Sequence, residues 1–362
     1  MAEHLARRPE VGRVVCLFPP IMPVRRYAFP VRAQGINTKL ILLHCLIRAV
    51  STDRAPFRLR RWVNAQIMPV LHLFLRGLGL RGDNTVLWIF PPLPAPHIDS
   101  LLRRFPDCPV ITQVVDNFMA RDAKERDTLR DLAVEQYRAL SKISSSVVVG
   151  SRVMHEYFSG LQGQPILMEN AVDSRFIAEA SELPCRARGA APRLGYVGFI
   201  TERTDIGLLE CIARSRPDWH LVLAGAVHGI LPESIQPLVS LPNVEYLGHV
   251  VYDELPGLMA SFDVCLIPHK DTPLSRSMSP LKFFQYLGSG RPIVSTPVAG
   301  VDRFRDHCFI ATTCAEFISQ IEVAIRVTTT EASKQRIEAA RTETWEARLS
   351  DLWPKVQQRF GR

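Results

Sequence analysis

Short apolar runs recur along both halves of the chain, and segments of helical character separate them. In the first half the runs are residues 13–18, 85–90, 110–115 and 146–150, and in the second half 193–199, 220–224, 244–247, 263–267 and 293–296. Runs this short and continuously apolar are typical of parallel strands that helices cover on both faces. A helix with one apolar side is expected over residues 123–142. The alternation predicts an α/β chain with two Rossmann-like sheets that face each other across a cleft.

The length of 362 residues supports this division, because it allows two domains of about 150 to 180 residues each. Residues 179–192 have the composition of a linker, with two prolines and a glycine among small and basic residues. We therefore expect a first domain over residues 1–182 and a second over 190–330. Residues 331–362 are expected to form one or two helices.

Composition indicates a soluble protein of the cytoplasm. Hydrophobic residues make up 47% of the chain and charged residues 22%, which is ordinary for a globular protein. No apolar run approaches the roughly 20 residues that span a bilayer, and the first residues lack the apolar core of a signal peptide. The eight cysteines occur singly, without a C-x-x-C spacing, so we expect reduced core residues and neither a disulfide framework nor a zinc site.

The net charge of +8 is concentrated near the start of the chain. Residues 1–81 contain 14 Lys and Arg against three Asp and Glu. Two interpretations stay open: a well-solvated basic surface, or a basic face attracted to anionic lipid headgroups or to a lipid-diphosphate acceptor. Residues 57–76 have the same two readings, as a helix on a membrane surface or as a helix packed within the first domain. Nucleic acid is not expected as a partner, because no recognisable binding module is present.

Residues 275–301 carry the strongest local signal for a ligand. A turn-prone Ser-Met-Ser-Pro sequence leads into a short apolar segment, and two glycines close that segment before a strand-like run. Free backbone N–H groups at the start of such a helix attract anions, and Lys282 in the first turn adds a positive charge. A second loop, residues 195–205, places Gly198 and Arg203 between a strand and a helix. Together the two loops predict a site for a phosphate-bearing ligand.

The same residues resemble the nucleotide-sugar signature of retaining GT-B glycosyltransferases of family 4, the glycosyl transferases group 1 type. The signature reads S/N-P-x-K-x-x-E-Y-L-A-x-G-x-P-V-V-S-T-P, and the chain matches it at Ser279, Pro280, Lys282, Tyr286, Leu287, Gly290, Pro292, Val294, Ser295, Thr296 and Pro297. Gln285 departs from it, since the family carries there a glutamate that binds the ribose hydroxyls. Ser277 stands where the broader family often has an upstream glutamate. An amide can still donate and accept hydrogen bonds, but it brings no charge.

The resemblance implies a donor site on the second domain. It would consist of Gly198, Glu202, Arg203, Asp205, His249, Arg276, Ser279, Lys282 and Gln285, with the loop near His249 close to the base. Arg203 and Lys282 would stabilise the charge of the leaving diphosphate. The alternative for Arg203 is a surface ion pair with Glu202 or Asp205. Residues 170–173, Asn-Ala-Val-Asp, resemble the Asn-Gly-Val-Asp of the cleft floor, with Ala171 in place of glycine; a plain Asx turn is the alternative.

The acceptor side is less defined by the sequence. Asp116 follows a predicted strand at the cleft edge and either orients a sugar or acceptor hydroxyl, as a catalytic residue beside Arg203 and Lys282, or caps a helix. His97 and His155 are further candidates, although a lone histidine is more often structural.

The resemblance implies transfer of a sugar, with retention, from a nucleotide diphosphate sugar to a glycan or lipid-linked acceptor in polysaccharide or glycoconjugate biosynthesis. It implies no metal and no cofactor besides the donor substrate, and the helices of residues 331–362 would cross back to the first, acceptor-binding domain. The cytoplasm, or the inner face of the membrane, is the expected location. A nucleotide-sugar epimerase and a catalytically inactive partner protein are the alternatives, and Gln285 and Ala171 favour the second of these.

Overall fold

The computed structural model describes most of the second half of the chain and parts of the first. The described residues are 5, 11, 14–18, 31–35, 40–45, 73, 75–81, 85–90, 102–106, 108–120, 127–161, 164–184 and 191–358. His97 and most of the basic residues 1–81, including nearly all of 57–76, lie outside these ranges. Among the described residues, no helix is long and apolar enough to cross a membrane.

A four-stranded parallel sheet forms the centre of the first half, with the strands in the order β4-β5-β6-β7. The strands are β4 (Leu87–Ile89), β5 (Val110–Val114), β6 (Ser146–Val149) and β7 (Pro165–Leu167). The short helix η4 (Phe118–Ala120) follows β5, and the helices α4 (Asp127–Ile143) and α5 (Arg152–Ser159) flank β6 in sequence. Strands expected at 85–90, 110–115 and 146–150 are confirmed, as is the helix expected at 123–142.

A separate three-stranded sheet contains the strand expected at residues 13–18. Its strands are β1 (Val14–Phe18), β2 (Val31–Gly35) and β3 (Leu40–Cys45), in the order β1-β3-β2. β1 runs parallel to β3, whereas β2 is antiparallel to it. The expectation that β1 joins one parallel set with the later strands is therefore wrong for the described pairings. Its partner in the described sheet is β3, an apolar run that we did not predict as a strand.

The second half contains a six-stranded parallel sheet in the order β10-β9-β8-β11-β12-β13. Its strands are β8 (Arg193–Val197), β9 (His220–Ala224), β10 (Val244–Gly248), β11 (Val264–Ile267), β12 (Ile293–Ser295) and β13 (Phe309–Ile310). The first five confirm the strands expected from the sequence, and β13 was not expected. The order reverses between β8 and β11, and ligands of open α/β sheets bind at the carboxyl ends of the strands at such a switch point.

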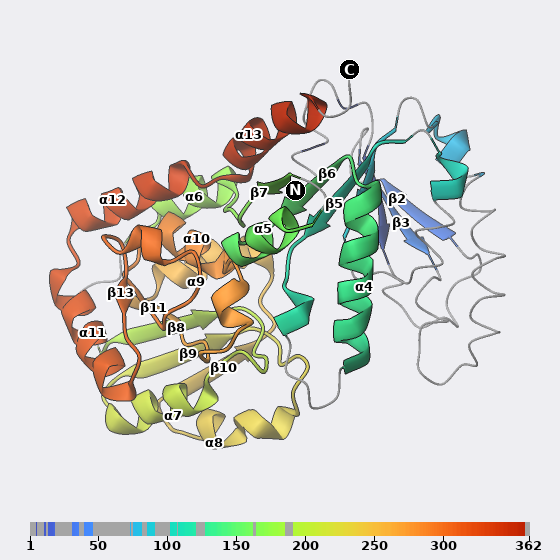
Figure 1. The fold of residues 1–362 in the computed structure, drawn as a ribbon. Helices are drawn as coiled ribbons and strands as arrows, with labels where there is room; N and C mark the ends of the chain where they lie inside the picture. Colours follow the sequence, from blue (N-terminus) through green and yellow to red (C-terminus); the bar gives the residue numbers. More distant parts are fainter. Residues whose placement is uncertain are drawn as a thin grey trace.

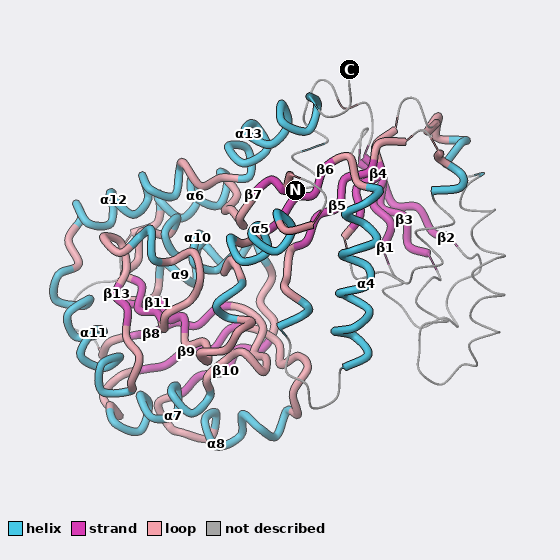
Figure 2. The backbone as a smooth tube through the Cα atoms, in the orientation of Figure 1, coloured by secondary structure: helices cyan, strands magenta, loops and turns pink. Residues whose placement is uncertain are grey.

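Helices cover both faces of this second sheet (Figures 1 and 2). They are α7 (Ile206–Ser215), α8 (Gln236–Val239), α9 (Leu255–Ala260), α10 (Leu281–Gly288) and α11 (Cys314–Val327), with the short helices η5 (Pro232–Ile235), η6 (Tyr252–Glu254), η7 (Ser275–Ser277) and η8 (Asp302–Phe304). One core cluster joins the sheet to α7 and α11, and a second joins it to α9 and α10. The inner strands β8, β9, β11 and β12 are therefore buried on both faces, which explains the continuous apolar runs of the sequence, whereas the edge strands β10 and β13 are only partly buried.

The chain passes between the two large sheets twice, and the two passages lie side by side. They precede α6 (Ser174–Glu182) and α13 (Trp345–Gln358), and α12 (Thr330–Arg341) runs between α11 and α13. Val172 donates its N–H to the Glu343 carbonyl (3.0 Å), and Trp345 donates to the Val172 carbonyl (3.1 Å). α13 then packs its apolar side, Leu349, Leu352 and Val356, on the first sheet. Figure 1 shows α12 and α13 running along the top of both sheets.

A disulfide corrects the expectation that every cysteine is reduced. Cys211 of α7 is bonded to Cys314 at the start of α11, with a Cα–Cα distance of 6.3 Å. The spacing could not show this pair, because the two residues are 103 positions apart and only the shared face of the sheet brings their helices together. Cys108, Cys265 and Cys308 are free and buried, as expected.

We expect the Cys211–Cys314 bond to stabilise the second sheet against unfolding. A cross-link that closes a loop of this length lowers the entropy of the unfolded chain by an amount equivalent to about 5 kcal/mol. Urea unfolding of the wild type should shift to lower midpoint when reductant is added, whereas a Cys211→Ser/Cys314→Ser variant should be insensitive to reductant. Identical wild-type curves with and without reductant would contradict the bond.

Candidate functional site

Lys282 lies in the first turn of α10, at the carboxyl edge of the second sheet. Its Nζ donates to the hydroxyl of Tyr196 (2.8 Å) and lies 4.0 Å from the centre of that ring. The Tyr196 hydroxyl donates in turn to the carbonyl of Phe199 (2.7 Å). Burial lowers the pKa of the Lys282 ammonium; the hydrogen bond and charge of Tyr196 oppose this effect, and Arg203 adds to it. The ammonium is therefore partly desolvated and held in place, and an anion beside it would be bound strongly.

Two glycines bring the backbone close to this ammonium. Gly198 has a φ of +126°, and a Cβ added to it would lie 3.2 Å from Lys282 Cε and Nζ. Gly225, with a φ of +155°, packs so closely on the Gly198 carbonyl that a side chain there would collide with it. The Gly198 N–H donates to the Ala224 carbonyl (2.8 Å), which fixes the loop to the end of β9. A larger residue at position 198 would crowd the amine that the site presents.

The side chains of Arg203, in the loop after β8, and of Asp116, directly after β5, approach each other. Arg203 Nη1 lies 3.9 Å from Asp116 Oδ1, and both side chains are partly exposed, at 26% and 34%. The structure thus brings together the three residues predicted as catalytic, because Arg203 also acts electrostatically on Lys282. A half-exposed pair at this distance contributes little to stability, so Arg203 can exchange Asp116 for a ligand anion at small cost. Asp205 is not its partner: Asp205 accepts from the Leu208 N–H (2.9 Å) as the cap of α7.

The start of α10 is tied to the segment that connects the sheets. Ser279 accepts two hydrogen bonds from Asn170, one at Oγ from the backbone N–H (3.0 Å) and one at its carbonyl from Nδ2 (2.5 Å). Asp173, three residues further on, caps α6 by accepting from the Arg175 N–H (2.8 Å). Ala171 is fully buried. Residues 170–173 therefore position α10, and their described contacts are with the protein itself.

Gln285 faces a different corner of the site from Lys282. It is buried on α10 and lies close to the hydroxyl of Tyr252, the first residue of η6. Burial raises the pKa of Tyr252 to about 12; the nearby charge of Asp173 adds to the rise, and the Gln285 side chain opposes it. His249 lies exposed between β10 and η6. The Gln285 amide, the Tyr252 hydroxyl and residues 249–251 lie on the β10 side of the second sheet.

Three other predicted residues lie apart from Lys282. Arg276 makes a bidentate pair with Asp271 (2.6 Å for both bonds), and both side chains are exposed. Glu202 is exposed beside Gly229. His155 lies within α5, partly exposed, and its backbone N–H donates to the Ser151 carbonyl (2.9 Å). Among the described residues, no group of three His, Cys, Asp or Glu side chains is placed to hold a metal ion.

His269 belongs to the site and was not singled out from the sequence. It follows β11, its N–H donates to Thr296 Oγ1 (3.1 Å), and its Nδ1 lies 3.3 Å from the carbonyl of Arg203. A carbonyl only accepts, so Nδ1 carries the proton. Burial, and then the charges of Lys282 and Arg203, lower the pKa of His269 well below its ordinary value of 6.5. A neutral His269 therefore fixes the backbone of the Arg203 loop; its place directly after a strand and Pro268 was the available signal.

We expect His269 to make stability depend on pH below about 6.5. The unfolded chain takes up a proton near the ordinary pKa, whereas the folded protein resists protonation, so the free energy of unfolding falls as the pH is lowered from 6.5. The slope contributed by one such group is at most about 1.4 kcal/mol per pH unit. Urea unfolding between pH 7 and pH 5 should show this loss in the wild type and a shallower loss in His269→Gln. The exposed His249→Gln variant is the control, and equal slopes in His269→Gln and the wild type would contradict the assignment.

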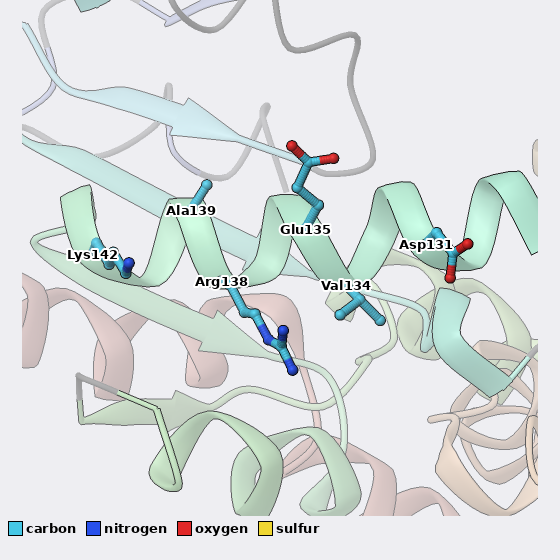
Figure 3. A pocket seen from close by; sticks show the side chains of 6 residues that line it. All are labelled: Asp131, Val134, Glu135, Arg138, Ala139 and Lys142. Atoms are coloured by element: carbon cyan, nitrogen blue, oxygen red, sulfur yellow. The ribbon is translucent and has the colours of Figure 1, made fainter.

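A hollow of about 400 Å³ runs along α4 (Figure 3). Its described wall comes from that single helix, with Asp131, Glu135, Arg138 and Lys142 beside Val134 and Ala139. Its two acidic residues precede its two basic ones along the helix, and no residue of the Lys282 site reaches it. It carries no part of the site described above.

Comparison with known proteins finds a family match in the second half of the chain. Residues 191–326 match the family described as Glycosyl transferases group 1. A protein of Bacillus subtilis (strain 168), TuaH, provisionally named a teichuronic acid biosynthesis glycosyltransferase, is 28% identical over 196 residues. That match covers 49% of this chain and 47% of the relative, so the chain spans about half the length of the curated relative it matches.

Solved structures with the same arrangement cover most of the chain. An α,α-trehalose 6-phosphate synthase from Burkholderia multivorans superposes with a TM-score of 0.68 at 11% identity, over 95% of this chain and 91% of that one. HepE of Anabaena, solved in complex with UDP-glucose, superposes with a TM-score of 0.57 at 15% identity, over 82% and 80% of the two chains. At these identities the likeness concerns the fold. It confirms the expected GT-B architecture of two α/β domains with parallel sheets.

Proposed function

We propose that the chain is a retaining glycosyltransferase that uses a nucleotide diphosphate sugar and a glycan or lipid-linked acceptor in polysaccharide or glycoconjugate biosynthesis. The observation that carries the proposal is the Lys282 ammonium. It is partly desolvated, held by Tyr196, and placed beside Gly198 and within the electrostatic reach of Arg203 at the switch point of the second sheet. The group 1 domain of residues 191–326 and the name of the Bacillus relative support the same reaction class.

In the proposed reaction, the bond between the anomeric carbon and the diphosphate oxygen breaks, and a bond to the acceptor oxygen forms on the same face of the sugar. The proton of the acceptor hydroxyl passes to the departing phosphate oxygen. Negative charge grows on the diphosphate in the transition state, where Lys282 and Arg203 would stabilise it. Asp116, which lies 3.9 Å from Arg203, would be released to orient a hydroxyl when Arg203 contacts the diphosphate. We propose these two cations for the role that a metal plays in other transferases.

The nucleotide would lie along the β8–β10 side of the sheet. The diphosphate would contact Lys282, Arg203 and the Gly198 backbone, and the ribose would face Gln285 and Tyr252. The loop at His249 would hold the base through backbone groups. UDP is the first nucleotide to test, since HepE was solved with UDP-glucose. The basic composition of residues 1–81 supports a peripheral contact with an anionic membrane at its inner face, where a lipid-linked acceptor would be found.

We expect Lys282→Ala and Arg203→Ala to weaken nucleotide binding or turnover about 100-fold each, on the order of 3 kcal/mol. Isothermal titration of the full chain with UDP, GDP, dTDP and ADP, followed by turnover with the corresponding sugar nucleotides, measures this loss. Lys334→Ala on α12 and Arg326→Ala on α11 are matched controls, because both side chains are exposed and neither belongs to the loops that carry Arg203 and Lys282. An unchanged affinity and rate in Lys282→Ala would refute the site.

Gln285→Glu should tighten nucleotide binding if the ribose lies against this side chain. A carboxylate accepts from both ribose hydroxyls more strongly than a neutral amide does. The gain should be seen with UDP and be smaller with 2′-deoxy-UDP, which lacks one hydroxyl. Tyr252→Phe is the control, because it removes the hydroxyl that lies beside Gln285. Weaker binding of UDP in Gln285→Glu would mean that this part of the site requires the neutral amide beside Tyr252.

The inactive partner protein is the second candidate, favoured by the neutral Gln285, which is buried beside Tyr252 at the position expected to contact the ribose. The same titration separates the two. Failure of all four nucleotides to bind a folded chain would support the partner protein. Interconversion of a sugar nucleotide without any acceptor would instead indicate an epimerase.

A further inference from the structure

A cavity of about 580 Å³ lies between the two halves of the molecule, on the β12 side of α10. Its volume is that of a small-ligand site. Tyr196, Arg203 and Lys282 do not line it. The cavity is therefore a second space in the cleft, separate from the cations proposed to hold the diphosphate.

Both halves supply its walls. From the first half come the start of α5, at Ser151–Val153, and Glu169 after β7; from the second come the loop before α10 and the loop after β12. α5 and η7 pack against each other, and Figure 1 shows α5 at the border between the two sheets. Met278 and Val298 are buried among the polar lining residues, and Val153 is exposed to the cavity. A wall of this kind offers apolar surface for a sugar ring together with groups for its hydroxyls.

The charged side chains of the wall are paired, with one exception. Arg276 is held by Asp271 (2.6 Å), and Arg303 bonds both Glu169 (2.8 Å) and Glu343 (2.8 Å). Asp302 is held by Arg305 (3.0 Å). Arg152 has no carboxylate within ion-pair distance in the described part of the chain. Arg348 also contacts Glu169 and Glu343, so the ion pairs around the cavity balance one another. The exposed Arg152 is therefore the charged lining residue that has no ion-pair partner among the described residues.

The backbone around Arg152 adds to this positive potential. The Ser151 hydroxyl accepts from the Met154 N–H (3.4 Å), and the Ser151 carbonyl accepts from the His155 N–H (2.9 Å). The N–H groups of Arg152 and Val153, at the first two positions of α5, have no such bond among the described residues. Two free backbone donors and one free guanidinium meet at the same wall, and together they favour an anion.

We propose that this cavity binds an acidic saccharide, whose carboxylate or phosphate is held by Arg152 and whose ring lies against Val153 and Met278. The paired groups Asp271, Arg276 and Glu169 offer donors and acceptors for its hydroxyls. The inference rests on the proposed function, in which the saccharide is the acceptor or part of it. A carboxylate and a phosphate share the required chemistry, and the two are separated by the choice of probe.

The test is a titration of the full chain, by ligand-observed NMR, with methyl β-glucuronide, glucose 6-phosphate and neutral methyl β-glucoside. We expect at least one acidic probe to bind ten times more tightly than the neutral one. Arg152→Ala should abolish this difference, Arg152→Lys should restore part of it, and Arg130→Ala on α4 should leave it unchanged. The acidic probe that loses more affinity in Arg152→Ala identifies the acid group.

Val153→Trp provides an independent check, because it fills the cavity without altering its charge. It should weaken all three probes and leave UDP binding unchanged. Equal affinity for acidic and neutral probes, no effect of Arg152→Ala, or displacement of the acidic probe by UDP would each overturn the proposal. If no nucleotide binds but the acidic probe binds through Arg152, the proposal for the cavity is supported and the proposed transferase function is refuted. If UDP binds through Lys282 and no acidic probe binds, the cavity proposal fails alone.

Discussion

The paired crossing of the chain between the two sheets determines the geometry of the cleft. Val172 bonds Glu343 and Trp345 through its backbone, so the two passages form one short ladder and not two independent linkers. A cluster of charges surrounds it: Glu169 and Glu343, with side chains only 11% and 8% exposed, are bonded by Arg303, and Arg348 contacts both carboxylates. Carboxylates this buried require paired cations. The cluster joins the first sheet, the loop after β12 and α13, and so restricts how the two halves can move.

Contacts across the cleft depend on that restriction. Asn170 reaches Ser279 at the start of α10, Asn117 donates to Ser277 (3.2 Å), and Asp116 approaches Arg203. Each contact joins a residue of the first half to one of the two loops of the second half that are predicted to bind the ligand, residues 195–205 and 275–301. A rotation of one half against the other would lose all three. The contacts at the crossing therefore fix the relative orientation of the two halves. In that orientation, Lys282 and the 580 Å³ cavity face the same cleft.

The ligand loops combine two opposing demands. Cations that bind an anion strongly must be partly removed from water, yet an unpaired buried charge is costly. The structure meets both by giving Lys282 a tyrosine hydroxyl and Arg203 a distant carboxylate, partners that are weaker than a diphosphate. Neutral His269 supports the Arg203 backbone without adding a charge. The glycines at 198 and 225 keep the approach to Lys282 open.

The sequence by itself determined the alternating strands and helices, the two loops around Gly198 and Lys282, and the expectation of two sheets, because these depend on local periodicity and on residues close together in the chain. Only the tertiary structure decided which distant residues meet. The Cys211–Cys314 bond, the approach of Arg203 to Asp116 and the Glu169–Arg303 pair at the crossing each join positions separated by 80 or more residues, about which local patterns contain no information. The same holds for His269, whose role depends on its contact with the Arg203 carbonyl. It also holds for Arg152, which has no ion-pair partner among the described residues that line the cavity.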